Sequence, residues 1–243
     1  MTLVTAYDYP TGRLLDEAGV DIVLVGDSLG MVVLGFPDTT HVTLDHMLHH
    51  VEATARGVKN ALLVGDMPIH SYDTVEQAVQ SAKKLFLAGA DAVKLEGGAA
   101  QAGNIRAIAD AGIPVVGHIG LLPQKVLEEG GYRIKGKSSA EEEALVRDVE
   151  AVAEAGACAV VVEGVTPHAA RQVTVHSSIP TLGIGSGSHT CDGDVVVIHD
   201  LVGAFPWFIP AFVKPRADVA GSMTAAVKEW MEDCYTDPGS ISS

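Results

Sequence analysis

The chain has 243 residues, 47% of them hydrophobic, and its 31 acidic side chains against 16 Lys and Arg give a formal net charge of −15. This length supports one large core, so we expect a single domain over residues 1–243, and the acidic surface argues against nucleic acid as a partner. The sequence shows neither a signal segment nor an apolar run long enough to cross a membrane, so we expect a cytoplasmic protein with no membrane partner.

Short β-branched runs alternate with helical periodicity along the chain. The runs predict strands at residues 3–7, 22–27, 61–66, 92–96, 114–119, 159–163, 181–185 and 195–200. Most are apolar on both faces, as in parallel strands covered by helices on one side and a packed interior on the other. Eight strands in a chain of this length favour one (β/α)8 barrel over an open doubly wound sheet, which usually shows fewer βα units and a Gly-rich dinucleotide loop.

Residues 121–139 form the longest break in this rhythm. They contain Gly130-Gly131 and four of the basic residues of an acidic chain, namely Lys125, Arg133, Lys135 and Lys137. A connection of this length is typical of a functional loop or lid, although a plain surface excursion is the alternative.

The three cysteines, Cys158, Cys191 and Cys234, lie far apart and form no CxxC pair. This spacing suggests neither a structural zinc site nor a disulfide framework, so we expect buried or idle thiols. We have no interpretation of Cys191.

Polar side chains stand at the carboxyl ends of five predicted strands. They are Asp27, Asp66, Glu96, His118 and Glu163. In a barrel these ends meet at one mouth, where such folds keep their catalytic residues. An acidic residue at a strand end can instead cap the next helix, but the next helical patterns begin only at about Leu44 and Val75, which weakens that explanation.

Asp27, Asp66 and Glu96 follow consecutive strands, and three neighbouring carboxylates repel one another unless a cation or a proton intervenes. Because Mg2+ prefers oxygen ligands, the trio predicts a magnesium site. Lys94 lies two residues before Glu96, so both side chains point to the same face, near the ion. A purely structural ion pair is the alternative.

Glu163 lies across the predicted barrel from the trio, where it suits a general base facing a bound substrate. His118 either orients the substrate or is a core histidine with satisfied hydrogen bonds. The Gly-rich turn at residues 183–187 could bind phosphate or let the backbone approach a ligand. These residues alone indicate a metal-assisted lyase, aldolase or isomerase acting on a small oxyanion.

Several ordered segments resemble the ketopantoate hydroxymethyltransferase family in register from about Leu3 to Lys214. They are Val4-Thr5-Ala6-Tyr7-Asp8, Leu24-Val25-Gly26-Asp27-Ser28-Leu29-Gly30, Val93-Lys94-Leu95-Glu96-Gly97-Gly98, Gly117-His118-Ile119-Gly120-Leu121-Leu122-Pro123-Gln124, Gly130-Gly131-Tyr132-Arg133 and Gly183-Ile184-Gly185-Ser186-Gly187. The resemblance implies a TIM barrel of the phosphoenolpyruvate/2-oxo acid-binding type.

The resemblance also implies roles for individual residues. Asp27, Asp66 and Glu96 would lie around Mg2+, with Glu96 acting through water and other divalent ions left open. The 2-oxo acid would contact Asp27, Ser28, Asp66 and Lys94, and we add His118 as a candidate substrate-binding residue. Glu163 would be the catalytic proton acceptor.

The implied reaction converts 3-methyl-2-oxobutanoate to 2-dehydropantoate, a step of pantothenate biosynthesis. The one-carbon unit would come from 5,10-methylenetetrahydrofolate, with another reduced pterin left open as the donor. Resemblance further implies a homo-oligomer, often a decamer in this family.

Three departures from the family pattern and two rival functions accompany this hypothesis, and Cys191 is one of the departures. Family members usually carry a leader before the first strand, which bears on closure of the barrel bottom and on subunit contacts, and Ala211 stands where the family tends to have a basic residue. One rival is a metal-dependent 2-oxo acid lyase or mutase of the isocitrate lyase type. It is disfavoured because residues 121–139 contain no cysteine. The other rival is a non-catalytic barrel subunit.

Overall fold

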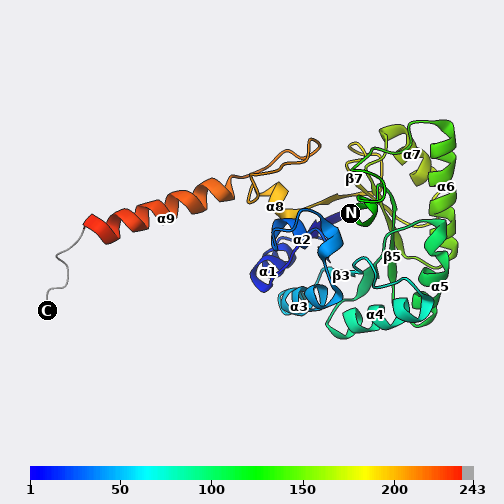
Figure 1. Ribbon diagram of the computed structural model, residues 1–243, viewed down its shortest axis with the longest axis horizontal. Coiled ribbons are helices and arrows are strands. Elements are labelled where there is room, and N and C mark those ends of the chain that lie inside the picture. Colours follow the sequence, from blue (N-terminus) through cyan, green and yellow to red (C-terminus); the bar gives the residue numbers. More distant parts are fainter. Residues whose placement is uncertain (237–243) are drawn as a thin grey trace. The chain divides into compact units, whose positions relative to one another are not determined.

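The computed structural model describes residues 1–236, and eight parallel strands close into a barrel in chain order (Figure 1). The strands are β1 (Thr2–Thr5), β2 (Ile22–Val25), β3 (Leu62–Asp66), β4 (Ala92–Lys94), β5 (Val115–Gly120), β6 (Ala159–Glu163), β7 (Thr181–Ile184) and β8 (Gly193–Val196). β1 pairs with β8 as well as with β2, and this pairing closes the barrel. The predicted (β/α)8 fold is therefore confirmed.

Helices separate successive strands from β1 to β7, whereas β7 leads to β8 without a helix between them. They are α1 (Tyr9–Glu17), α2 (Leu29–Val32), α3 (Leu44–Ala55), α4 (Val75–Leu87), α5 (Ala102–Asp110), α6 (Ser139–Glu154) and α7 (Pro167–His176), with short 3-10 turns η1 (Thr39–His41), η2 (Ala99–Gln101) and η3 (Pro123–Lys125). Side-chain hydroxyls begin several of them: Thr43, Thr74 and Ser138 each accept a backbone N–H of the first turn. Such caps satisfy donors that have no partner within the helix.

Aliphatic side chains from all the strands fill the barrel interior. Leu3, Leu24, Val64, Val116 and Leu182 are among its buried members. These side chains come from alternate positions along the strands, as expected when one face of each strand points into the barrel. A packed interior leaves the polar strand ends at the mouth as the place for chemistry.

The eighth strand lies earlier in the chain than residues 195–200, and the predicted bounds are wrong. β8 begins at Gly193, where it pairs with Leu182 of β7, and the short helix α8 (Ile198–Leu201) already begins at Ile198. A Cβ on Gly193 would lie 2.4 Å from the backbone oxygen of Met1. The close approach of the Met1 backbone, directly before β1, therefore requires glycine at this position.

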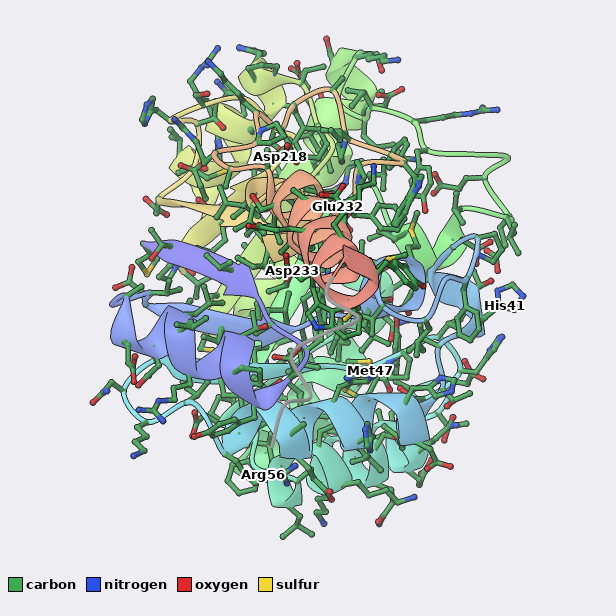
Figure 2. All side chains as sticks on the ribbon, turned by 90° about the vertical axis from the view of Figure 1, so that its left-hand side faces the viewer. His41, Met47, Arg56, Asp218, Glu232 and Asp233 are labelled. Atoms are coloured by element: carbon green, nitrogen blue, oxygen red, sulfur yellow. The ribbon has the colours of Figure 1, made fainter. Side chains whose placement is uncertain are left out.

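Contacts divide the chain into two compact units. The barrel occupies Met1–Val197, and the second unit begins at Ile198 and contains α8 and α9 (Val219–Thr236). Glu232 and Asp233 lie on α9 (Figure 2). The assignment of residues 1–243 to a single domain stays a prediction. Among residues 1–236, no helix combines the length and apolarity required for a membrane span.

All three cysteines are free. Cys158 and Cys234 are exposed and Cys191 is half-buried, so the expectation that the thiols are buried is wrong, and the alternative that they are idle stays a prediction. Cys158 lies in the turn between α6 and β6 rather than on an inward face of the strand, which accounts for its exposure.

Candidate active site

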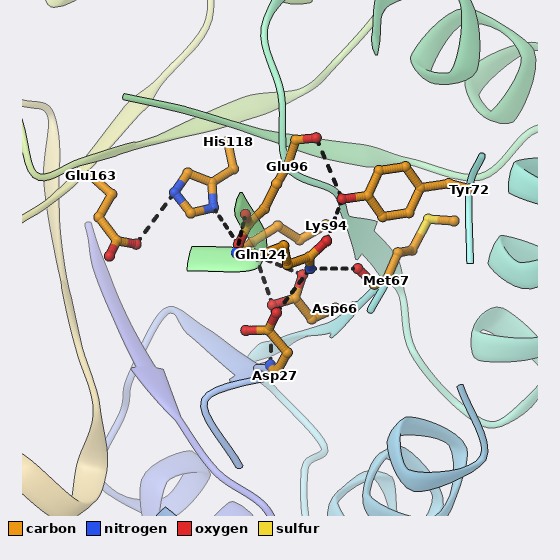
Figure 3. Close-up of polar contacts among 9 residues, drawn as sticks. All are labelled: Asp27, Asp66, Met67, Tyr72, Lys94, Glu96, His118, Gln124 and Glu163. Carbon is orange, nitrogen blue, oxygen red and sulfur yellow. Dashed lines mark hydrogen bonds and ion pairs between the residues drawn. The ribbon is translucent and has the colours of Figure 1, made fainter. Parts of the chain in front are cut away.

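Polar side chains from the ends of β2 to β6 meet at the mouth of the barrel (Figure 3). Asp66 ends β3 directly beside Lys94 of β4 in the strand register. Glu96 follows Lys94 in a stretch that runs along β5, since the Gly97 N–H donates to the His118 carbonyl at 2.9 Å. Asp27, Asp66, Lys94, Glu96 and His118 are buried, whereas the Glu163 side chain is 22% exposed and can therefore meet a substrate entering from solvent.

Lys94 and Asp66 form the central ion pair. The Lys94 ammonium donates to both carboxylate oxygens of Asp66, at 2.6 and 2.7 Å. Burial acts to lower the pKa of Lys94, but the charges of Asp66, Glu96 and Asp27 outweigh it and raise that pKa above its usual value. Lys94 is therefore a fixed positive charge in the mouth.

The carboxylates of Asp27 and Glu96 form no comparable ion pair with Lys94. Burial first, and repulsion by the neighbouring carboxylates second, raise the pKa of both Asp27 and Glu96. For Asp27, Lys94 and a hydrogen bond from Gln124 partly offset the rise. A cation bound between them would offset the repulsion between the carboxylates and stabilise their charged forms.

Gln124, which sequence reasoning missed, links the carboxylates. Its backbone N–H donates to Glu96 Oε2 at 3.0 Å, and its side-chain amide donates to Asp27 Oδ2 at 2.8 Å and to the Met67 carbonyl at 3.0 Å. The amide oxygen accepts the Tyr72 hydroxyl. Each half of the amide therefore has a partner of the right polarity, which fixes its orientation.

Tyr72 was also missed. Burial, followed by the charges of Glu96 and Asp66, raises its pKa well above the usual value, so its hydroxyl stays protonated and donates to Gln124. Gln124 closes one of the family-like segments, which was the available signal for it. Tyr72 lies in the loop after β3, where strand periodicity gives no signal.

His118 lies between two carboxylates. Its Nε2 is 3.3 Å from Glu163 Oε2, and its Nδ1 is 3.6 Å from Glu96 Oε1. Within the described residues, neither ring nitrogen has a hydrogen bond of good geometry, and neither does Glu96 Oε1. The core-histidine alternative is therefore disfavoured, since a histidine of that kind has its partners satisfied; contact with substrate stays a prediction for His118.

Helix capping does not explain the strand-end aspartates. Thr74 caps α4, and Ser28 precedes α2 without a side-chain capping bond. The expectation that the next helix after Asp27 begins only at about Leu44 is wrong, because the short helix α2 starts at Leu29. The Ser28 hydroxyl is hydrogen-bonded to the Tyr7 hydroxyl at 2.8 Å, beside Asp27 at the mouth.

The oxygen-rich side of the mouth matches the chemistry of a hard cation. In the described part of the chain, no three His, Cys, Asp or Glu side chains are already arranged as a metal-binding group, and Lys94 holds both oxygens of Asp66. Glu96 Oε1 nevertheless lies buried without a hydrogen bond. Mg2+ typically takes one or two carboxylates and completes its shell with water or substrate, so these residues fit it.

The Gly-rich turn at residues 183–187 follows β7. Its Ser186 hydroxyl donates to the Val162 carbonyl at 2.7 Å and is buried. That hydroxyl therefore stabilises the turn through its own hydrogen bond. Phosphate binding by this segment stays a prediction.

The sequence matches a family model described as ketopantoate hydroxymethyltransferase over residues 1–238. The chain belongs to this family. The 3-methyl-2-oxobutanoate hydroxymethyltransferase of Ignicoccus hospitalis is 50% identical over 234 residues, which cover 96% of this chain and 88% of the relative. The enzyme of the same name from Moorella thermoacetica is 50% identical over 235 residues, covering 96% of this chain and 87% of the relative.

The ketopantoate hydroxymethyltransferase fold is shared with more distant enzymes. A phosphoenolpyruvate phosphomutase from Streptomyces platensis matches with a TM-score of 0.68 at 18% identity, covering 96% of this chain and 83% of the other. A phosphonopyruvate hydrolase in complex with oxalate and Mg2+ matches with a TM-score of 0.65 at 15% identity, covering 97% and 94%. At these identities the likeness concerns the fold alone, whereas family membership rests on the sequence relatives.

Proposed function

We propose that this protein transfers the one-carbon unit of 5,10-methylenetetrahydrofolate to 3-methyl-2-oxobutanoate, giving 2-dehydropantoate for pantothenate biosynthesis. The observation that carries the proposal is the arrangement of the mouth. A buried cation–carboxylate cluster of Lys94, Asp66, Asp27 and Glu96 faces a partly exposed carboxylate, Glu163, with His118 between them. Membership of the family supports the same reaction.

Lys94 and Ser28 supply the polar contacts for the oxo acid. The protonated Lys94 offers positive charge to the oxygen on which negative charge develops, and burial strengthens that interaction because little water screens it. Ser28, held by the Tyr7 hydroxyl, lies beside Asp27 to orient the carboxylate end. His118 contacts Glu163 and could also meet the substrate.

Asp27, Asp66 and Glu96 are the side chains that would hold a divalent cation. When bound, Mg2+ withdraws electron density from a 2-oxo acid and makes the proton on its branched carbon easier to remove. The buried Glu96 Oε1 without a hydrogen bond and the raised pKa values of Asp27 and Glu96 support this assignment. Oxygen donors suit Mg2+, and other divalent ions stay open.

Glu163 is the proposed general base. It takes the proton from the branched carbon, and the electron pair of that C–H bond is delocalised toward the 2-oxo oxygen near Lys94. The branched carbon then forms a bond to the methylene carbon, whose bonds to the pterin nitrogens break. Water supplies the hydroxyl of the product, and the tetrahydropterin leaves with a proton on each of the two nitrogens: one comes from that water, and the other is the proton that Glu163 took from the branched carbon.

Hydrogen exchange tests the first half of this sequence without the pterin. In D2O with Mg2+, the protein is expected to exchange the single hydrogen on the branched carbon of 3-methyl-2-oxobutanoate, followed by NMR. Glu163→Gln should slow this exchange by about 10²–10⁴-fold, because it removes the general base. Exchange that is absent with Mg2+ present, or unaffected by Glu163→Gln, would refute the assignment.

The rival functions receive less support. A lyase or mutase shares the fold, but the relatives at 50% identity bear the hydroxymethyltransferase name. A non-catalytic subunit would have no use for the buried Lys94–Asp66 pair at a solvent-accessible mouth. Turnover of the oxo acid by cleavage rather than by one-carbon addition would favour the lyase.

We also propose a homo-oligomer, with the decamer as the family-based expectation; a cytoplasmic location stays a prediction. Along α9, Met223, Val227 and Trp230 are exposed at 65, 55 and 66%, and their spacing places them on one side of the helix. An apolar stripe of this kind is typical of a surface that packs against another copy. Trp230→Glu is expected to shift the sedimentation velocity toward smaller species, and an unchanged distribution would remove α9 from the interface.

A further inference from the structure

Residues 121–139, the mouth loop, are attached at three places around the active site. Gln124 binds Asp27 and Glu96 at the start of the loop. At its end, the Lys135 N–H donates to the Gly164 carbonyl at 2.9 Å, directly after Glu163. Between these points the Tyr132 hydroxyl lies 3.9 Å from Met31 Sδ of α2. The loop therefore spans the mouth from β5 to α2 and returns to β6.

Tyr132 brings an available aromatic ring to the mouth. The residue is 51% exposed, whereas Tyr7 and Tyr72 are buried and hydrogen-bonded within the site. Burial, together with the charges of Asp38 and Glu163, raises the pKa of Tyr132 to about 12, which agrees with a position near the site carboxylates. A half-exposed ring at this place can stack against a flat ligand.

The same loop carries cations without protein partners. Lys125, Arg133 and Lys137 are exposed, and in residues 1–236 their side chains make no hydrogen bond or ion pair, whereas Lys135 pairs with Glu129. Four cations against Glu128 and Glu129 give this loop a net positive charge in a chain whose net charge is −15, which suits an anionic group.

We propose that the mouth loop is the binding platform for the one-carbon donor: the reduced pterin ring stacks on Tyr132, and the carboxylates of the donor's tail face Arg133, with Lys125 and Lys137 beside it. This inference rests on the proposed transfer reaction. What it adds is the place of that donor, whose tail is anionic and contains glutamate, at the rim of the mouth.

The size and charge of the two substrates support a site for the oxo acid inside the mouth and a site for the donor at its rim. The oxo acid is small, and its contacts are the buried groups at the strand ends. The donor is larger and must reach the same carbon from solvent, which places its bulk at the rim. Flat rings and carboxylates are the groups that an exposed tyrosine and an adjacent arginine recognise.

Steady-state kinetics of the full-length protein test the platform. Tyr132→Ala should raise the KM for 5,10-methylenetetrahydrofolate by about 5–150-fold, and Tyr132→Phe, which keeps the ring, should restore most of the affinity. Arg133→Ala should raise that KM by about 3–10-fold and reduce any preference for a triglutamyl over a monoglutamyl donor. Lys59→Ala, an exposed lysine before β3, is the charge-matched control and should change neither value.

Deuterium exchange on the oxo acid serves as the internal reference, because it requires no pterin. Retained exchange in the Tyr132 and Arg133 variants shows that the fold and the oxo-acid site are intact. Direct titration of the wild-type protein and the variants with triglutamyl tetrahydrofolate, by calorimetry, tests the platform even if the wild-type protein catalyses no exchange. Unchanged donor KM and unchanged calorimetric affinity in both Tyr132→Ala and Arg133→Ala would overturn the inference.

Discussion

The Lys94–Asp66 pair offers a sharp test of how the mouth is built. Lys94→Met keeps the length of the side chain but removes its charge. The Asp66 carboxylate, which is 1% exposed, then keeps one hydrogen-bond donor, the Asp27 N–H at 3.2 Å. Removing one partner of a buried pair typically costs roughly 3–5 kcal/mol, because the other charge stays buried without compensation. In a chain of this size that corresponds to a fall in Tm of about 6–20 °C.

The double variant Lys94→Met/Asp66→Asn separates stability from chemistry. It should recover most of the lost stability, since neither charge remains, but it should not recover the deuterium exchange. The exchange should fall by about 10²–10³-fold in both variants, as expected when a charge facing the developing enolate is removed. Calorimetric melting and NMR exchange measure the two effects, with Lys59→Met as the exposed-lysine control. A Lys94→Met protein that melts and exchanges like the wild type would refute the reasoning.

Three further outcomes are expected. Gln124→Leu removes the amide acceptor of the Tyr72 hydroxyl, leaving it a 3.5 Å contact with the Glu96 carbonyl, and removes the amide donor to the Met67 carbonyl. It should therefore lower the free energy of unfolding by about 1–3 kcal/mol in urea titrations and raise the KM for the oxo acid; an unchanged KM would limit Gln124 to a structural role. Hydrogen bonds from the backbone N–H groups of Ala61 and Asn60 lower the pKa of Asp16 to about 2, so its stabilising contribution is present above the unfolded-state pKa near 3.8 and is lost as the pH falls toward 2. The urea midpoint of Asp16→Asn should therefore depend less on pH across this window than the midpoint of the wild type. An equal change of the midpoint with pH in both proteins would contradict the stabilising role of Asp16. Chelation of divalent ions with EDTA should abolish the deuterium exchange and added Mg2+ should restore it, whereas exchange that persists in EDTA would argue against a metal site.

The order of elements and most candidate site residues could be predicted before the structure. A parallel strand that is buried on both faces is a run of apolar residues in the sequence. A charged residue at the end of such a run is expected to lie at the mouth. Asp27, Asp66, Glu96, His118 and Glu163 were found in this way, and the structure brings all five together at the mouth. Their roles as ligands, base and substrate contacts stay predictions.

Other features depended on contacts between distant parts of the chain. The Tyr72–Gln124 hydrogen bond joins residues 52 positions apart, and Gln124 reaches Asp27 across 97 positions. β8 begins at Gly193 because the backbone of β1 lies against it, which no local propensity can indicate.

The sequence by itself determined the family, the barrel and the set of polar strand ends, because these follow from local apolar patterns and from motifs read in order. Only the tertiary structure decided that Lys94 neutralises Asp66, that Gln124 joins Asp27 to Glu96, and that His118 stands between Glu96 and Glu163. Those pairings depend on distances of a few ångströms between separate strands and loops. Side-chain identity alone does not fix such distances, since each carboxylate had several oppositely charged or hydrogen-bonding groups available at the same mouth.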